Sequence, residues 1–255
     1  MRKTYSILGC GWLGFELAKY FITQDNIVHG STTSADKMEQ LEAEHILPFL
    51  VDITNNDSKE LETFLQAEVL VIAITSKDVS AFVKLIDAIE RSPITKVIFI
   101  SSTSVYPSLN SIVTESHTTV NSPLRSIECL FSTNTKFKTT IIRFAGLYGG
   151  NRHPGNWFTT RKIPNPLGYV NMIHRDDCIA IIAQLIDNNI FGTVFNACTT
   201  HHPTRLDFYK NARKSLGKEH PDFESDEVLS YKIISSEKLI QYLNYSFKHT
   251  DLLNL

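Results

Sequence analysis

The chain has 255 residues, which is enough for one large domain or for one domain with a small additional lobe. Hydrophobic residues make up 42% and charged residues 20% of it, as is ordinary for a globular protein. The net charge of -2 gives no reason to expect nucleic acid or an anionic membrane as a partner.

The four cysteines are widely spaced and none forms a C-x-x-C pair, which favours reduced cytoplasmic thiols over disulfides or a metal site. A strand pattern begins at Tyr5, leaving no room for a signal peptide. No apolar run approaches the roughly 20 residues that a membrane span needs. We therefore expect a cytoplasmic protein that binds no metal.

A glycine-rich turn near the N-terminus is the strongest functional signal. The apolar run 5–8 predicts a buried strand, and the segment up to residue 21 predicts a helix. Between them, Gly9, Gly11 and Gly14 have the G-x-G-x-x-G spacing of a dinucleotide-binding loop. The alternative is a turn with a purely structural role.

Each glycine has a distinct expected role in that loop. Gly9 allows a tight turn, Gly11 lets the main chain approach a diphosphate, and Gly14 lets the helix pack on the strand. The helix N-terminus offers N–H groups and a partial positive charge to the phosphates. We expect Cys10, Trp12 and Leu13 to flank the cofactor.

Strands and helices then alternate through the first two thirds of the chain. We expect strands at 26–31, 46–51, 68–74, 96–100 and 139–143, and helices at 35–43, 58–65, 79–90 and about 126–131. Strands that are apolar throughout indicate a parallel sheet covered on both faces. The predicted fold is therefore α/β, a Rossmann-type doubly wound parallel sheet.

Beyond Tyr148 the pattern becomes rich in loops. We expect strands at 193–196 and 231–234, and helices at 175–186, 204–216 and 236–243. These segments predict a small C-terminal α/β substrate lobe. We place an NAD(P)-binding domain at 1–150 and the lobe at 151–255, with the segments near 172–198 packing back on the first domain.

The end of the second strand discriminates between the nicotinamide cofactors, because a carboxylate there bonds the ribose of NAD. Here the hydroxyls of Ser31, Thr32 and Thr33 precede Lys37, so we expect NADP, with NAD as the alternative. Asp52 either bonds the adenine edge or starts the next turn. The predicted cofactor site also includes Ile53, Ala73, Ile74 and Thr75.

Four later segments together carry a family resemblance. They are 99–106 (FISSTSVY), 142–149 (IRFAGLYG), 172–177 (MIHRDD) and 192–196 (GTVFN). In this order they resemble the extended short-chain dehydrogenase/reductase superfamily, the NAD(P)-dependent sugar epimerase/dehydratase family. The resemblance covers nearly the whole chain. It implies a small-molecule substrate such as a nucleotide-sugar.

The resemblance also implies roles for single residues. The hydroxyl at Ser102 is catalytic in that family, where it orients the substrate's carbonyl or hydroxyl. The alternative is a strand-end serine that satisfies nearby backbone groups. The loop after Tyr148 and the segment at His174 border the family's substrate cleft.

Two departures distinguish this chain from the family pattern. The family loop is usually G-x-x-G-x-x-G, and its active site has a Tyr and a Lys four residues apart on the helix after the fifth strand. The tyrosine passes a proton while the lysine lowers its pKa. The corresponding segment 121–131 contains neither residue, and Arg125 would remain charged.

The sequence therefore supports two hypotheses of different classes. The first is an atypical NAD(P)-dependent epimerase, dehydratase or reductase, in which Tyr148, His174 or a water carries the proton. The second is a non-catalytic NAD(P)-binding redox sensor or regulatory protein. Asp176 and Asp177 join His174 in an acid–base group or cap the helix that follows. Either a monomer or a homodimer is compatible with the sequence.

Overall fold

The computed structural model describes residues 2–55, 58–225 and 229–255. Contacts divide the chain into two compact units. Unit 1 comprises the residues up to Ser101, Asn121–Ile142 and Ile182–Val194, and unit 2 comprises Ser102–Val120, Arg143–Ile181 and Phe195–Leu255. The domain boundary at residue 150 stays a prediction.

A seven-stranded sheet has the order β10-β7-β5-β4-β1-β2-β3. Its strands are β1 (Thr4–Leu8), β2 (Ile27–Thr32), β3 (Leu47–Leu50), β4 (Val69–Ile72), β5 (Lys96–Ser102), β7 (Lys138–Phe144) and β10 (Val194–Ala197). The pairs β1–β2, β1–β4, β2–β3 and β4–β5 are parallel. The order runs outward from β1 in both directions, which confirms the predicted doubly wound α/β fold.

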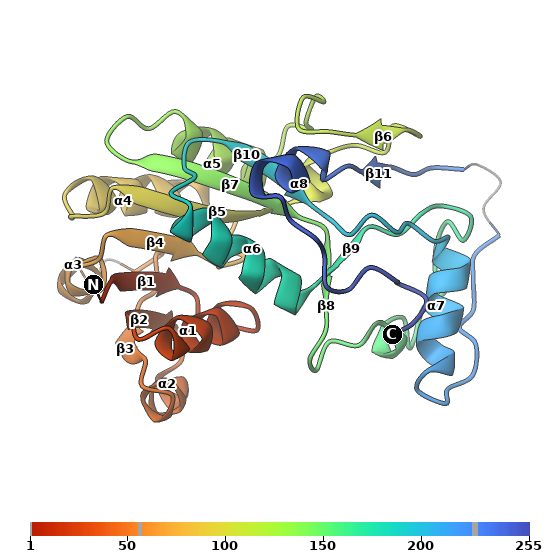
Figure 1. The fold of residues 1–255 in the computed structure, drawn as a ribbon, viewed down its shortest axis with the longest axis horizontal. Coiled ribbons are helices and arrows are strands. Elements are labelled where there is room, and N and C mark those ends of the chain that lie inside the picture. The colour runs from red at the N-terminus through yellow and green to blue at the C-terminus, as the bar shows by residue number, and fades with distance from the viewer. Residues whose placement is uncertain (1, 56–57, 226–228) are drawn as a thin grey trace. The chain divides into compact units, whose positions relative to one another are not determined.

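Helices alternate with these strands along the chain (Figure 1). They are α1 (Gly14–Thr23), α2 (Met38–Ala43), α3 (Ser58–Phe64), α4 (Val79–Glu90), α5 (Pro123–Ser132), α6 (Arg175–Asp187), α7 (Arg205–Lys214) and α8 (Glu237–Leu243). Three 3-10 turns are η1 (Ala35–Lys37), η2 (Thr103–Val105) and η3 (Pro154–Asn156). The expected helix at 35–43 is thus divided between η1 and α2.

Side chains of unit 1 alternate between the two faces of the sheet, as strand geometry requires. On one face Tyr5 of β1 packs against Phe21 of α1, with ring centroids 4.5 Å apart. Leu8 belongs to the opposite cluster, where Phe82 of α4, Phe99 of β5 and Phe131 of α5 meet. Because helices cover both faces, the inner strands β1 and β4 are buried almost throughout.

Capping residues set the start of several helices. Asp78 accepts a hydrogen bond from the Ala81 N–H at the start of α4, and Ser122 does the same for the Arg125 N–H of α5. The predicted cap Thr204 accepts from the Asp207 N–H of α7. Each cap satisfies an N–H that the helix itself leaves unpaired.

Unit 2 contains two small parallel ribbons in addition. Strand β6 (Ile112–Val113) pairs with β11 (Ile233–Ile234), and β8 (Gly146–Tyr148) pairs with β9 (Met172–His174). An apolar cluster joins Tyr148 to Phe208 and Tyr209 of α7. Trp157 and Phe158, which follow η3, pack against this cluster, so they belong to the interior of unit 2.

None of the helices within the described ranges has the length and apolar character to cross a bilayer.

Candidate functional site

The glycine loop of unit 1 joins β1 to α1, and two of its glycines are required by the fold itself. Gly9 has a φ of +97°, and a Cβ there would lie 2.6 Å from Cγ2 of Ile74. A Cβ on Gly14 would lie 2.1 Å from the carbonyl oxygen of Gly9. The helix can therefore approach the strand this closely only without side chains at both positions.

Gly11 differs, because no heavy atom lies within 4 Å of where its Cβ would be. Its φ lies outside the left-handed region, so the backbone there does not require glycine either. The main chain of Gly11 borders open space, and Leu13 provides no side-chain cap for the start of α1. Bare main chain beside an uncapped helix N-terminus fits a diphosphate group.

The hydroxyl groups at the end of β2 and just after it divide into buried and exposed ones. Ser31 is 1% exposed, its Oγ accepts from the Gly9 N–H at 2.8 Å, and its carbonyl accepts from the Cys10 N–H at 2.7 Å. Ser31 therefore holds the glycine loop in place. Oγ1 of the buried Thr32 accepts from the Ser34 N–H, whereas Thr33 and Lys37 are exposed.

The remaining residues predicted for the cofactor site line the neighbouring strand ends. Ala73 and Ile74, after β4, are the neighbours that a side chain at Gly9 would meet, and Thr75 is exposed beyond them. Asp52 is exposed, and the Thr54 hydroxyl and N–H hold the pKa of its carboxyl below the usual value. Asp52 thus starts the next turn, while Ile53 is buried.

Cys10 and Trp12 also lie in the glycine loop. Burial raises the pKa of the Cys10 thiol to about 12, so the thiol stays protonated at neutral pH. Cys10 is thus a packing residue of the loop.

Ser102, at the start of η2 in unit 2, uses its hydroxyl oxygen as a hydrogen-bond acceptor. Its Oγ accepts from the Ser104 N–H at 3.1 Å, which is the backbone-satisfying role that we considered as the alternative. The hydroxyl proton is still available for donation, because a serine hydroxyl both accepts and donates. The geometry therefore leaves the catalytic interpretation open.

Tyr106 is 2% exposed and lies in the core of unit 2. Its OH donates to Oδ1 of Asn196 at 2.9 Å and accepts from Nη1 of Arg143 at 2.5 Å. Nζ of Lys232 donates to the carbonyls of Thr103, at 2.9 Å, and Tyr106, at 2.5 Å. No sequence pattern indicated Lys232, because it comes from a distant part of the chain.

Helix α5 lies where the family has its Tyr and Lys, and it contains neither. Its Glu128 is fully buried and accepts from the Ser101 hydroxyl at 2.6 Å and from Arg125 at 3.3 Å. The inward face of α5 in unit 1 is therefore occupied by a structural carboxylate.

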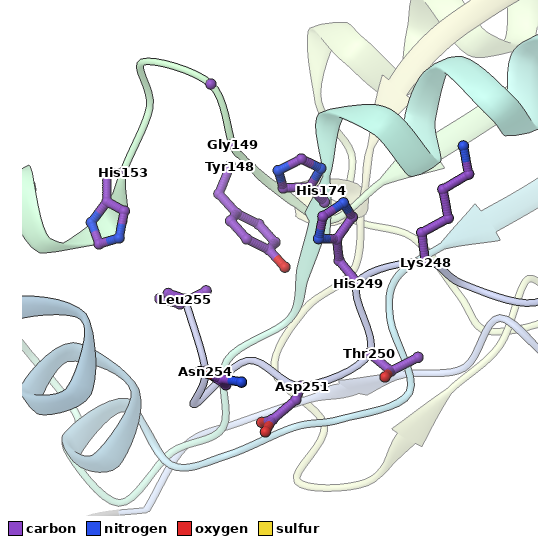
Figure 2. A pocket seen from close by; sticks show the side chains of 11 residues that line it. Tyr148, Gly149, His153, His174, Lys248, His249, Thr250, Asp251, Asn254 and Leu255 are labelled. Carbon is purple, nitrogen blue, oxygen red and sulfur yellow. The ribbon is translucent and has the colours of Figure 1, made fainter. Parts of the chain in front are cut away.

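A pocket of about 440 Å³ lies within unit 2 (Figure 2). Its lining residues are Tyr148, Gly149, Gly150, His153, His174, Lys248, His249, Thr250, Asp251, Asn254 and Leu255. Tyr148 and His174, both predicted from the sequence, line it from β8 and β9. The other wall is the C-terminal segment 248–255, for which the sequence indicated no role.

The two predicted proton carriers differ in their protonation. Burial, followed by the charges of Asp177 and Asp251, raises the pKa of Tyr148, so its phenol stays neutral. Burial, followed by the neighbouring His249, lowers the pKa of His174. A neutral imidazole can accept a proton, which makes His174 the more suitable of the two as a base.

Asp177 is fully buried in the first turn of α6. Its carboxylate accepts from the Tyr245 hydroxyl at 2.7 Å, from the Lys248 N–H at 2.8 Å and from the His249 N–H at 3.2 Å. These three bonds hold the C-terminal segment against α6 and so form the second wall of the pocket.

Protein YeeZ of Escherichia coli (strain K12) is 30% identical to this chain over 268 residues, covering 98% of this chain and 97% of YeeZ. This chain belongs to the YeeZ family. YeeZ of Escherichia coli O157:H7 matches it with the same identity and coverage. No protein-family model matches the sequence.

Solved structures have the same fold as this YeeZ relative. A protein of Methylobacillus flagellatus described as an NAD-dependent epimerase/dehydratase is 24% identical, with a TM-score of 0.78 over 98% of this chain and 94% of its own. UDP-glucuronic acid 4-epimerase of Bacillus cereus, in complex with UDP-glucuronic acid and NAD, is 19% identical, with a TM-score of 0.80 over 98% and 96%.

A functionally unknown protein of Silicibacter pomeroyi matches similarly, with 19% identity and a TM-score of 0.80 over 98% of this chain and 95% of its own. These likenesses confirm, at the level of the fold, the resemblance to the extended short-chain dehydrogenase/reductase superfamily. This chain therefore has the fold of these solved structures.

Proposed function

We propose that the protein binds a nicotinamide dinucleotide at the glycine loop and acts on a nucleotide-sugar or a related carbonyl or hydroxyl compound. The observation that carries the proposal is the open space at Gly11, which no packing requirement of the chain explains. The NAD and UDP-sugar complexes of proteins with this fold support the same assignment.

The chain's own residues would act in the following way. The main chain at Gly11 and the N-terminus of α1 hold the diphosphate, and Ser31 fixes the loop through the Gly9 N–H. A bound nicotinamide ring would supply the hydride chemistry. Ser102 donates a hydrogen bond to the substrate oxygen, and neutral His174 accepts the proton that the substrate hydroxyl releases as its carbon is oxidised.

We propose NADP as the cofactor, with NAD as the alternative. Lys37 and Thr33 are exposed after β2, and no ion pair of Lys37 occurs among the residues that the structure describes. The Lys37 ammonium is thus available to a 2′-phosphate. The Ser31 and Thr32 hydroxyls contribute less than the sequence suggested, because they are bonded internally.

Fluorescence titration with NADPH and NADH tests the cofactor proposal. We expect tighter binding of NADPH, and loss of binding in Gly11→Val with an unchanged melting temperature, because the new side chain fills only open space. Lys37→Ala should reduce the preference for NADPH, whereas exposed Lys59→Ala should leave it unchanged. Undiminished binding by a folded Gly11→Val variant would refute the proposal.

A non-catalytic NAD(P) sensor is the second candidate, and the absence of Tyr and Lys from α5 favours it. A panel of nucleotide-sugars and carbonyl compounds with NADPH separates the two functions. The enzyme requires turnover that Ser102→Ala abolishes and that Ser104→Ala, at the exposed neighbouring serine, retains. Tight NADPH binding without turnover of any panel member supports the sensor.

A further inference from the structure

Three side chains with metal-binding groups meet at the edge of the pocket in unit 2. His174 ends β9, Asp176 lies in the first turn of α6, and His249 belongs to the C-terminal segment. One donor atom from each lies within 4.8 Å of the others. Figure 2 shows the two imidazole rings lying against each other above Tyr148.

The distances in this cluster are too long for good hydrogen bonds. Oδ2 of Asp176 is 3.5 Å from Nδ1 of His174 and 3.4 Å from Nε2 of His249. Hydrogen bonds between nitrogen and oxygen are usually about 2.7–3.2 Å long. Two ligands bound at about 2.1 Å to one tetrahedral zinc ion are about 3.4 Å apart, as these atoms are.

The imidazole of His174 is in the form that a metal requires. The Asp176 N–H donates to Nδ1 of His174 at 3.2 Å, so this nitrogen presents a lone pair. A bound ion would replace that long contact. The rings of His174 and His249 are stacked with centroids 3.6 Å apart, a spacing that two neutral imidazoles tolerate better than two cations.

The backbone of the cluster is fixed without the participation of its donor atoms. Asp177 binds the N–H groups of Lys248 and His249, and the Thr199 hydroxyl donates to the His249 carbonyl at 3.2 Å. The segment that carries His249 is thus held through both its N–H groups and its carbonyl group. This arrangement keeps His249 beside His174, so binding an ion requires only side-chain rotations that turn the two stacked rings toward a common point.

We propose that His174, Asp176 and His249 bind one Zn²⁺ ion at the edge of the pocket. Imidazole and carboxylate donors suit this ion, and three protein ligands leave a fourth position for water or substrate, as in catalytic zinc sites. The pocket beside Tyr148 provides the space for that fourth ligand. The inference goes beyond the proposed function, because it requires neither dinucleotide nor turnover. With Zn²⁺ bound at Nδ1 of His174, a water would take the proton in place of that residue.

Calorimetric titration of the EDTA-treated full chain with ZnCl₂ tests the site, and Co²⁺ absorption reports its geometry. We expect one ion per chain and the intense visible bands of tetrahedral Co²⁺. Mutating residues that only contact the ligands weakens metal binding about 10–100-fold. Because His249→Ala and Asp176→Ala remove a ligand itself, each should weaken Zn²⁺ binding at least about 100-fold. His153→Ala is the matched control, since His153 lines the same pocket outside the cluster.

His201→Ala is a second control, because His201 and Asp251 form another histidine–carboxylate pair, 3.3 Å apart. Absence of Zn²⁺ binding by the folded wild-type chain would overturn the proposal. So would binding that His249→Ala and Asp176→Ala leave unchanged, or that only His201→Ala removes. Circular dichroism of each variant in EDTA verifies folding, and NADPH titration of the same samples tests the dinucleotide proposal separately.

Discussion

The glycine loop of unit 1 takes its structural residues from one short segment, Gly9–Gly14, with support from Ser31. The pocket of unit 2 takes its side chains from three segments that are far apart in the sequence, namely 148–153, His174 and 248–255. A local motif has a spacing that can be recognised, because one turn dictates it. A site assembled from distant segments has none, and its geometry depends on buried contacts such as those of Asp177.

The largest effect that sharpens this comparison is expected at Gly14. Gly14→Ala would place a Cβ 2.1 Å from the Gly9 carbonyl oxygen, a backbone atom that cannot rotate away. We expect a loss of about 3 kcal/mol or more in the free energy of unfolding, measured with urea. Gly11→Ala, in the same loop, should change it by less than about 0.5 kcal/mol. Equal stabilities of the two variants would show that close packing at Gly14 does not determine the conformation of the loop.

Removal of the Asp177 carboxylate is the corresponding test in unit 2. Asp177→Ala leaves the Tyr245 hydroxyl and two backbone N–H groups without their acceptor, which should cost about 2–3 kcal/mol. Hydrogen exchange should accelerate at residues 245–252 and not in α1. Asp187→Ala, at the exposed end of the same helix, is the control. Unchanged exchange at 245–252 would mean that other contacts form the pocket wall.

A smaller effect is expected at Ser31. Ser31→Ala deprives the Gly9 N–H of its acceptor and should lower the free energy of unfolding by about 1 kcal/mol. NADPH affinity should fall as well, because the loop loses its support. Thr33→Ala, at the exposed hydroxyl two residues later, should leave stability unchanged. If Thr33→Ala destabilises the protein as much as Ser31→Ala does, the role assigned to Ser31 is wrong.

The smallest effect is expected in the rates at which cysteine thiols are labelled. These rates report how often each region opens to solvent. Cys129 is exposed, whereas Cys10 of the loop and Cys178 and Cys198 of unit 2 are buried. Because burial raises the pKa of Cys10 to about 12, its thiolate is scarce at pH 8 and becomes more abundant as the pH rises. We expect one rapidly labelled thiol, lost in Cys129→Ser, and slower labelling of Cys10 when NADPH is present. Labelling of Cys10 as fast as Cys129 would contradict the structure.

Local patterns predicted the fold well. The apolar runs at β1 and β4 became buried parallel strands because helices cover both faces, whereas Leu47 and Leu50 of the edge strand β3 are exposed. The helix expected at 79–90 occurs with those limits. Thr204 caps α7 as its residue type suggested. In these elements the decisive interactions lie within a few residues of each other.

Predictions about single side chains depended on partners that no local pattern contains. Asn196 and Arg143 enclose the hydroxyl of Tyr106, and both are far from it in the sequence. For Asp177 the sequence left an acid–base group and a helix cap as alternatives, whereas its carboxylate bonds the main chain of the C-terminal segment. The proximity of His249 to His174 could not be foreseen either, since 75 positions of chain separate them. These contacts form between buried residues that are far apart in the sequence, so no local sequence pattern predicts them.

The buried bond between Ser101 and Glu128 has a consequence for protein engineering. It fixes the rotation of α5 about its own axis, because a carboxylate without exposure cannot turn toward solvent without losing its partners. A designer who wishes to graft the absent tyrosine and lysine onto α5 must therefore keep Glu128 or replace it together with Ser101. The simplest graft changes only residues of α5 that are not buried, and so keeps Ile127, Glu128 and Phe131. A new titrating step in the pH–rate profile would show that the grafted tyrosine takes part in the reaction.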